Sequence, residues 1–285
     1  MSLAATAPKK GSLSRVPIWL LVLALGMTVA FVTAWLDPGM RSTLAVLRNG
    51  VAITIRITLV GFALAMALGV AAGLARTSDN RLAREAATLY VEVVRGIPLL
   101  VLILWVGFGF TPWLLASVLQ VVANLAESGA ASTIMQPVAD FLAPCSQPRR
   151  CVPLEVRGVV GLAVGYGAYL AEIVRAGIES VSTGQREAAL SLGMTRWQMV
   201  RLVVLPQALK VALPPLGNDF IAMLKDRSLV SVLAVPELLQ QARFHISRTF
   251  QPFEVFNLVA LTYLLMTTVL SAGVRYLEKR MQTGD

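Results

Sequence analysis

Two charged side chains within apolar stretches of the sequence could together form a binding site. Arg56 lies in the apolar run of residues 51–74, and Glu172 lies in the run of residues 156–178. A charge inside a segment that enters a membrane costs at least ~2.5 kcal/mol, so each of these side chains needs a partner or a function. Held in one cavity, the guanidinium and the carboxylate would bind the carboxylate and the ammonium group of a zwitterion.

Glu172 also has simpler interpretations, which the sequence leaves open. Arg175 follows it by three residues, and side chains at this spacing are neighbours on a helix and can form an ion pair. Glu172 shares one helix face with the small residues Gly165, Ala168 and Ala176. Such a face suits either a cavity or a close contact between two helices.

Arg56 and Asn218 each have a structural alternative to a binding role. Arg56 lies near the start of its apolar run, so its side chain would extend to the outer lipid headgroups. Asn218 follows Pro214 and Pro215, and two prolines predict a broken helix whose free carbonyls line a polar pathway. A kink that serves only packing is the alternative.

The chain as a whole has the composition of an integral membrane protein. Of its 285 residues, 56% are hydrophobic and only 14% are charged, and the mean hydropathy is +0.70. Because soluble domains carry about a quarter charged residues, a soluble enzyme and a disordered chain are excluded. Several apolar runs reach the ~20 residues that a bilayer-spanning helix needs. We predict an all-α fold with about six transmembrane helices, at residues 17–36, 51–74, 99–119, 156–178, 208–224 and 253–274.

The distribution of Lys and Arg predicts that both termini are cytoplasmic. These residues are more numerous in residues 1–16, 76–95, 175–210 and 275–280 than in the segments on the other side. Residues 1–16 then form a cytoplasmic tail, and residues 120–155 form an outer insert. The net charge of +9 follows from this bias, and no basic run with interleaved aromatic residues indicates nucleic-acid binding.

Cys145 and Cys151 are the two cysteines of the chain, and both fall in the outer insert. In an oxidising outer compartment they would form a disulfide around residues 146–150, and two separate thiols are the alternative. Their spacing does not match a C-x-x-C metal pair, and the single histidine, His245, is distant in the sequence. We therefore predict no metal site.

The segment between the fourth and fifth predicted spans has an unusual pattern for a loop. It reads as a short helix, a turn at Gly193 and a second helix that Thr195 caps. Met194, Trp197 and Met199 give the second helix an apolar start. A helical hairpin with an apolar surface suits docking into the groove of a partner protein.

The residues of this segment resemble the signature loop of ABC importer permeases. The match consists of Glu187, Ala188, Ala189, Gly193, Leu205 and Pro206, at the family's spacing. Residues 90–100, 167–178 and 225–229 are similar to the polar amino acid permease branch, and the resemblance covers residues 45–280.

The resemblance implies the transmembrane domain of a type I ABC importer in a bacterial inner membrane, which transports an amino acid by alternating access. Residues 184–206 would be the loop that couples it to a separate cytoplasmic ATPase dimer. The other expected partners are a second permease subunit (a related chain or a second copy), an amino acid binding protein outside the cell, and membrane lipid. The chain has no G-x-x-x-x-G-K-[ST] loop, so ATP and Mg are expected on the ATPase, and the chain is expected to be neither an enzyme nor a cofactor protein.

Two features depart from the family pattern. Arg227 stands where the K-D-x-S-L segment usually has Thr or Ser, and the outer insert is longer than the usual connection. The sequence does not have the features that two other functions require. A secondary transporter predicts repeated halves, which we do not find, and an intramembrane enzyme predicts a nucleophile–base set or metal ligands within the spans.

Overall fold

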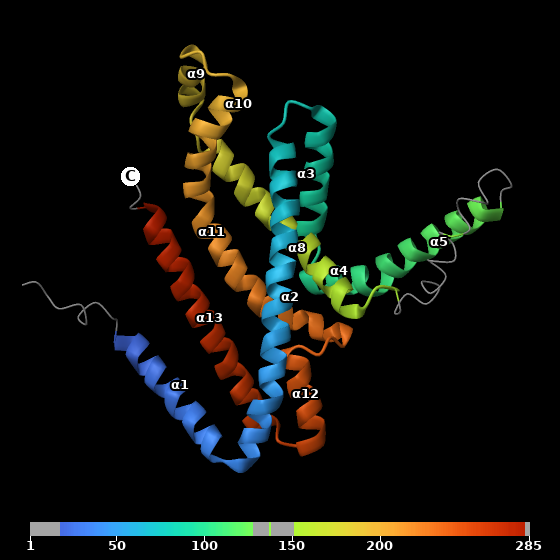
Figure 1. Ribbon diagram of the computed structural model, residues 1–285, viewed down its shortest axis with the longest axis vertical. Helices are drawn as coiled ribbons and strands as arrows, with labels where there is room; N and C mark the ends of the chain where they lie inside the picture. Colours follow the sequence, from blue (N-terminus) through green and yellow to red (C-terminus); the bar gives the residue numbers. More distant parts are fainter. Residues whose placement is uncertain (1–17, 128–136, 138–150, 283–285) are drawn as a thin grey trace, which may run out of the picture.

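The computed structural model describes residues 18–127, 137 and 151–282, and these are helical without a β-strand (Figure 1). This confirms the predicted all-α fold. In chain order the elements are α1 (Ile18–Leu36), α2 (Pro38–Arg76), α3 (Arg81–Gly96), α4 (Leu99–Leu104), the π-helical η2 (Trp105–Phe110), α5 (Thr111–Glu127), α8 (Leu154–Glu179), α9 (Thr183–Ser191), α10 (Arg196–Met199), the π-helical η4 (Val200–Val204), α11 (Leu205–Asp226), the 3₁₀ helix η5 (Arg227–Leu233), α12 (Leu238–Thr249) and α13 (Pro252–Gln282).

Five helical stretches of the described chain are long and apolar enough to span a membrane. They are Pro38–Arg76, Leu99–Leu125, Leu154–Glu179, Arg196–Leu233 and Pro252–Arg280. With the apolar helix α1 in front of them, they agree with the prediction of about six transmembrane helices. In Figure 1, α9 and α10 lie at one end of the molecule and α12 lies at the other.

Three elements differ from the sequence prediction. Helix α2 begins at Pro38 rather than at residue 51, because Asp37 caps it by accepting a hydrogen bond from the Gly39 N–H at 2.8 Å. The polar segment before the third span forms the amphipathic helix α3. Helix α11 continues through Pro214 and Pro215, so the prediction of a broken helix is wrong. The two prolines still leave the carbonyls one turn earlier without their usual N–H donors.

Helix α8 occupies the centre of the fold and packs against α2, α3, α4 and α11. Its buried side chains Leu162, Tyr166 and Leu170 belong to the main apolar core. Small residues let its neighbours approach closely, since a Cβ atom added at Gly69 of α2 would lie 2.6 Å from the Leu170 Cβ atom. The backbones of α2 and α8 therefore touch along their crossing.

We expect Gly69→Val to destabilise the protein by about 1–3 kcal/mol or to prevent its folding, because the new side chain overlaps the α8 backbone. Gly26 of α1 is the matched control, since a Cβ atom there has no neighbour within 4 Å. Thermal unfolding of the purified protein in detergent measures the effect. Equal melting temperatures for Gly69→Val and Gly26→Val would contradict the close crossing.

Candidate coupling site and ionic clusters

The segment between α8 and α11 forms the hairpin that the sequence predicts. The Ser182 hydroxyl caps α9, and Gly193 ends the turn after it with a φ of +80°. The Thr195 hydroxyl accepts a hydrogen bond from the Gln198 N–H, and the Gln198 side chain accepts one from the Thr195 N–H. This capping box fixes the start of α10. A glycine at positive φ and a capped helix make the shape of the hairpin a property of its own sequence.

The hairpin presents apolar side chains to the surface. Leu192 is 80% exposed and Trp197 is 69% exposed, whereas Ala189 is buried. Glu187, Ala188, Gly193, Leu205 and Pro206 are also exposed. Exposed apolar side chains that lie together in this way are typical of interaction surfaces.

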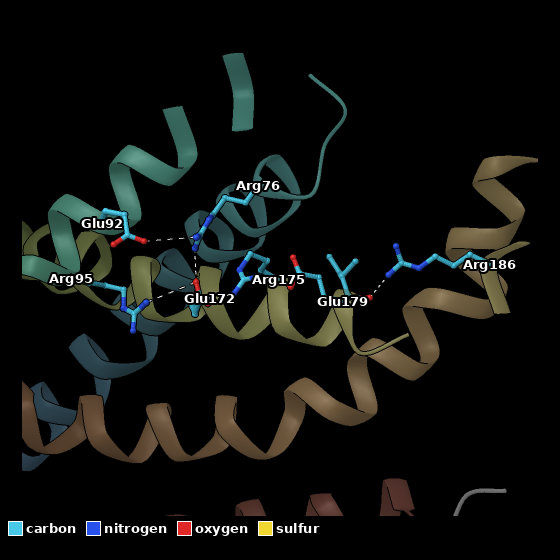
Figure 2. Close-up of polar contacts among 8 residues, drawn as sticks. Arg76, Glu92, Arg95, Glu172, Arg175, Glu179 and Arg186 are labelled. Atoms are coloured by element: carbon cyan, nitrogen blue, oxygen red, sulfur yellow. Dashed lines mark hydrogen bonds and ion pairs between the residues drawn. The ribbon is translucent and has the colours of Figure 1, made fainter. Parts of the chain in front are cut away.

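Glu172 is the centre of an ionic cluster below the hairpin (Figure 2). Its carboxylate accepts hydrogen bonds from Arg76 at the end of α2 and from Arg175 on its own helix. The Arg95 guanidinium of α3 lies 3.9 Å away. The predicted pair of Glu172 and Arg175 is confirmed, and the cluster joins α2, α3 and α8 through one carboxylate.

The cluster extends towards the hairpin. Arg175 also pairs with Glu179, at the end of α8. The Arg186 side chain of α9 donates a hydrogen bond to the Ile178 carbonyl, which Figure 2 draws as the dashed line that starts at Arg186. At the tip, Arg196 of α10 contacts Asp79, in the turn between α2 and α3, at 3.4 Å. These contacts connect the base of the hairpin to α8 and its tip to the α2–α3 turn.

The small residues near Glu172 pack within the chain. Ala168 is fully buried among Val91, Val94 and Leu102, and a Cβ atom added at Gly165 would lie 2.5 Å from the Leu99 Cδ1 atom. Gly165 and Ala168 thus lie in a close helix–helix contact, whereas Ala176, on the same face, is exposed.

Arg56 lies in a different part of the molecule from Glu172. Its guanidinium pairs with Glu155, in the first turn of α8. Glu155 and Glu172 are separated along α8 by roughly 25 Å at 1.5 Å per residue. The structure therefore does not bring Arg56 and Glu172 into one pocket, and a single amino acid does not span the distance between them.

Asn218 lies on an exposed face of α11. Val211, Asn218 and Lys225 are exposed and recur at seven-residue intervals, so they share this face. Of the two predicted disulfide partners, Cys151 is disulfide-bonded and Cys145 lies outside the described residues. Their pairing stays a prediction.

The sequence indicates neither the partner of Arg56 nor the pairing of Glu172 with Arg76, and it does not indicate that Arg227 is buried. Arg227, at the start of η5, is fully buried, and so is Glu237, which caps α12. The only signal in the sequence was the departure of Arg227 from the K-D-x-S-L pattern. The partners Arg76 and Glu155 come from helices distant in sequence, and no local pattern indicates them.

The chain is similar to known transport proteins over most of its length. Residues 154–283 match the model of the family "Binding-protein-dependent transport system inner membrane component". The chain is 35% identical to the glutamine transport system permease protein GlnP of Escherichia coli (strain K12), over 82% of this chain and 92% of that protein. It is 36% identical to the probable glutamine ABC transporter permease protein GlnM of Bacillus subtilis (strain 168), over 80% of this chain and 90% of that protein.

Solved structures show the same fold. The crystal structure of an amino acid ABC transporter with histidines matches with a TM-score of 0.67 and 32% identity, over 85% of this chain and 96% of that chain. An inward-facing MetNI methionine ABC transporter matches with a TM-score of 0.60 at 18% identity, over 84% of this chain and 97% of that chain, and supports the fold alone. These similarities confirm the family that the sequence motifs indicate. The chain belongs to the family of amino acid ABC transporter permeases, the membrane components of binding-protein-dependent transport systems.

Proposed function

We propose that this chain forms the translocation pathway of an ATP-driven amino acid importer and is coupled to a separate cytoplasmic ATPase through residues 184–206. The exposed apolar hairpin carries this proposal. Its shape is fixed by Gly193 and the Thr195 capping box, while Leu192 and Trp197 remain uncovered. A rigid hairpin with exposed apolar side chains suits docking into a groove of the ATPase. The permease itself is then non-catalytic, and the ATPase binds ATP and Mg.

In this proposal the hairpin and both termini lie in the cytoplasm, and α12 faces the outside. An amino acid binding protein delivers the substrate there. A second permease subunit, which is a related chain or a second copy, covers the exposed face of α11. Asn218 and Lys225 on that face would line the pathway between the two subunits.

Alternating access follows from the position of the hairpin. When the ATPase pair closes on nucleotide, the docked hairpins move together, and the helices joined to them change from the inward-open to the outward-open state. Arg186 and the Glu172 cluster would transmit this movement to α8, α2 and α3.

Purification of the tagged chain from its native membrane in mild detergent tests this function. We expect an ABC ATPase to co-purify in stoichiometric amount, and proteoliposomes containing the complex and the binding protein to take up an amino acid only with ATP. The mass of the complex distinguishes a second copy from a related chain. Amino acid uptake driven by an ion gradient, with no ATPase bound, would contradict the proposal.

A further inference from the structure

Arg227 is a buried cation without a hydrogen-bond partner in the described part of the chain. The side chain is 0% exposed, and none of its three guanidinium nitrogens has a hydrogen bond. A guanidinium carries five N–H donors, and burying a charge without a partner costs several kcal/mol. A group that satisfies these donors would therefore bind strongly.

Glu237 supplies a buried negative charge near Arg227 without pairing with it. Glu237 is also 0% exposed, and its carboxylate accepts hydrogen bonds from the Gln240 N–H at 2.8 Å and from the Tyr263 hydroxyl at 3.1 Å. Arg227 begins η5, and η5 packs against α12, which Glu237 caps. No ion pair within 4.0 Å joins them among the contacts of the described residues.

Arg227 and Glu237 carry opposite charges, and both are fully buried. Neither forms an ion pair with another side chain of the described residues, whereas Arg56 and Glu155 pair with each other. An inorganic anion would disturb this balance, whereas a ligand with one charge of each sign would preserve it.

We infer that Arg227 and Glu237 form the head-group site for a zwitterionic α-amino acid, with Arg227 binding its carboxylate and Glu237, assisted by Tyr263, binding its ammonium group. This inference rests on the proposed function, since it locates a substrate site in the same importer. The guanidinium would make a bidentate contact with the carboxylate. Arg227 would gain the hydrogen-bond acceptors it lacks, and Glu237 would gain a cationic partner in addition to its present hydrogen bonds.

Access to this site requires movement of η5, because the structure encloses Arg227. η5 is a seven-residue 3₁₀ helix that ends at Ala234, whose φ of +57° is in the left-handed region. A run of this length in the 3₁₀ form is uncommon, and non-glycine residues rarely adopt the left-handed conformation. These features make η5 the element that would open, and the site then belongs to a closed state of the importer.

A cycle that changes both the protein and the ligand tests the inference. The ligands are the standard L-amino acid that the complex transports fastest, its C-terminal amide and its deaminated analogue. Binding is measured on the permease–ATPase complex without the binding protein, both nucleotide-free and with a non-hydrolysable ATP analogue.

We expect the wild type to bind the amide about 10- to 100-fold more weakly than the amino acid, because the amide lacks the charge that Arg227 binds. The Arg227→Met variant should bind the amino acid more weakly by a similar factor. It should bind the amino acid and the amide with equal affinity.

Control variants separate a binding role from a structural one. Arg243→Met makes the same change at an exposed arginine of α12 and should leave binding unchanged. Glu237→Gln should bind the deaminated analogue as tightly as the amino acid. It should still bind the amide more weakly than the amino acid. If Arg227→Met only raises the melting temperature and binds all ligands as the wild type does, Arg227 has a structural role and the inference fails.

The ligand series keeps the test decisive if the variants do not fold. Wild-type complex that binds the amino acid, the amide and the deaminated analogue equally would overturn the head-group site while leaving the importer function intact. If none of the twenty amino acids is transported, the proposed function fails with it.

Discussion

Replacing Leu192 and Trp197 together by Asp is expected to abolish the association of the chain with the ATPase proposed as its partner. These side chains are 80% and 69% exposed in the isolated chain, and apolar anchors of this kind supply most of the binding energy of a protein interface. The loss of Trp197, a residue type that contributes roughly 2 kcal/mol or more at such positions, and the burial of two charges in the proposed apolar groove should together weaken association by more than about 100-fold. Co-purification of the ATPase and ATP-dependent uptake measure the loss.

The chain offers a matched control for this double variant. Phe250 and Phe253 are 84% and 75% exposed at the opposite end of the molecule, next to α12. Their replacement by Asp makes the same chemical change and should leave ATPase association unchanged. The double variant at the hairpin should also fold normally, because exposed side chains contribute little to stability. Retention of the ATPase by the Leu192→Asp/Trp197→Asp protein would refute the docking surface.

Gly193→Val is expected to uncouple ATP hydrolysis from uptake. Gly193 has a φ of +80° and no neighbour within 4 Å of an added Cβ atom, so the substitution acts on the backbone alone. A left-handed conformation costs an L-residue roughly 1–2 kcal/mol, and a β-branched side chain is among the least tolerant of it. The turn should therefore change shape and move α10 away from the orientation proposed for docking, with a fall in uptake of about tenfold.

Asn is the control at the same position, because it tolerates the left-handed conformation better than other side chains. Gly193→Asn should transport nearly as well as the wild type. Uptake per ATP hydrolysed, measured in proteoliposomes for both variants, isolates the effect of backbone shape. If Val and Asn behave alike, then the turn conformation is not required for coupling.

Local sequence patterns predicted the hairpin because its structure depends on local interactions. A glycine at positive φ, a Ser cap and a capping box are all made between residues a few positions apart. The pair of Glu172 and Arg175 was predictable for the same reason, since one helical turn separates the two residues. Apolar runs likewise located the spans, because a bilayer requires both length and hydrophobicity.

Features that depend on tertiary packing were not predictable from the sequence. Arg56 and Glu155 form a pair across 99 positions, and hydropathy does not indicate which helix faces which. The two prolines of α11 predicted a break, yet buried Ala212 and Leu216 hold this part of the helix in the core. Arg227 was recognised only as an unusual residue, because its burial arises from the packing of η5 against the rest of the fold.

The close crossing of α2 and α8 limits how the molecule can change shape. At Gly73, as at Gly69, an added Cβ atom would overlap α8, and at Gly50 it would lie 2.7 Å from the Leu238 Cα atom of α12. Because the backbones touch at these positions, α2 cannot slide along α8 or α12 without steric overlap. A displacement of one of these helices should therefore also displace the helices packed against it, and a change in the shape of the molecule would occur at contacts other than these.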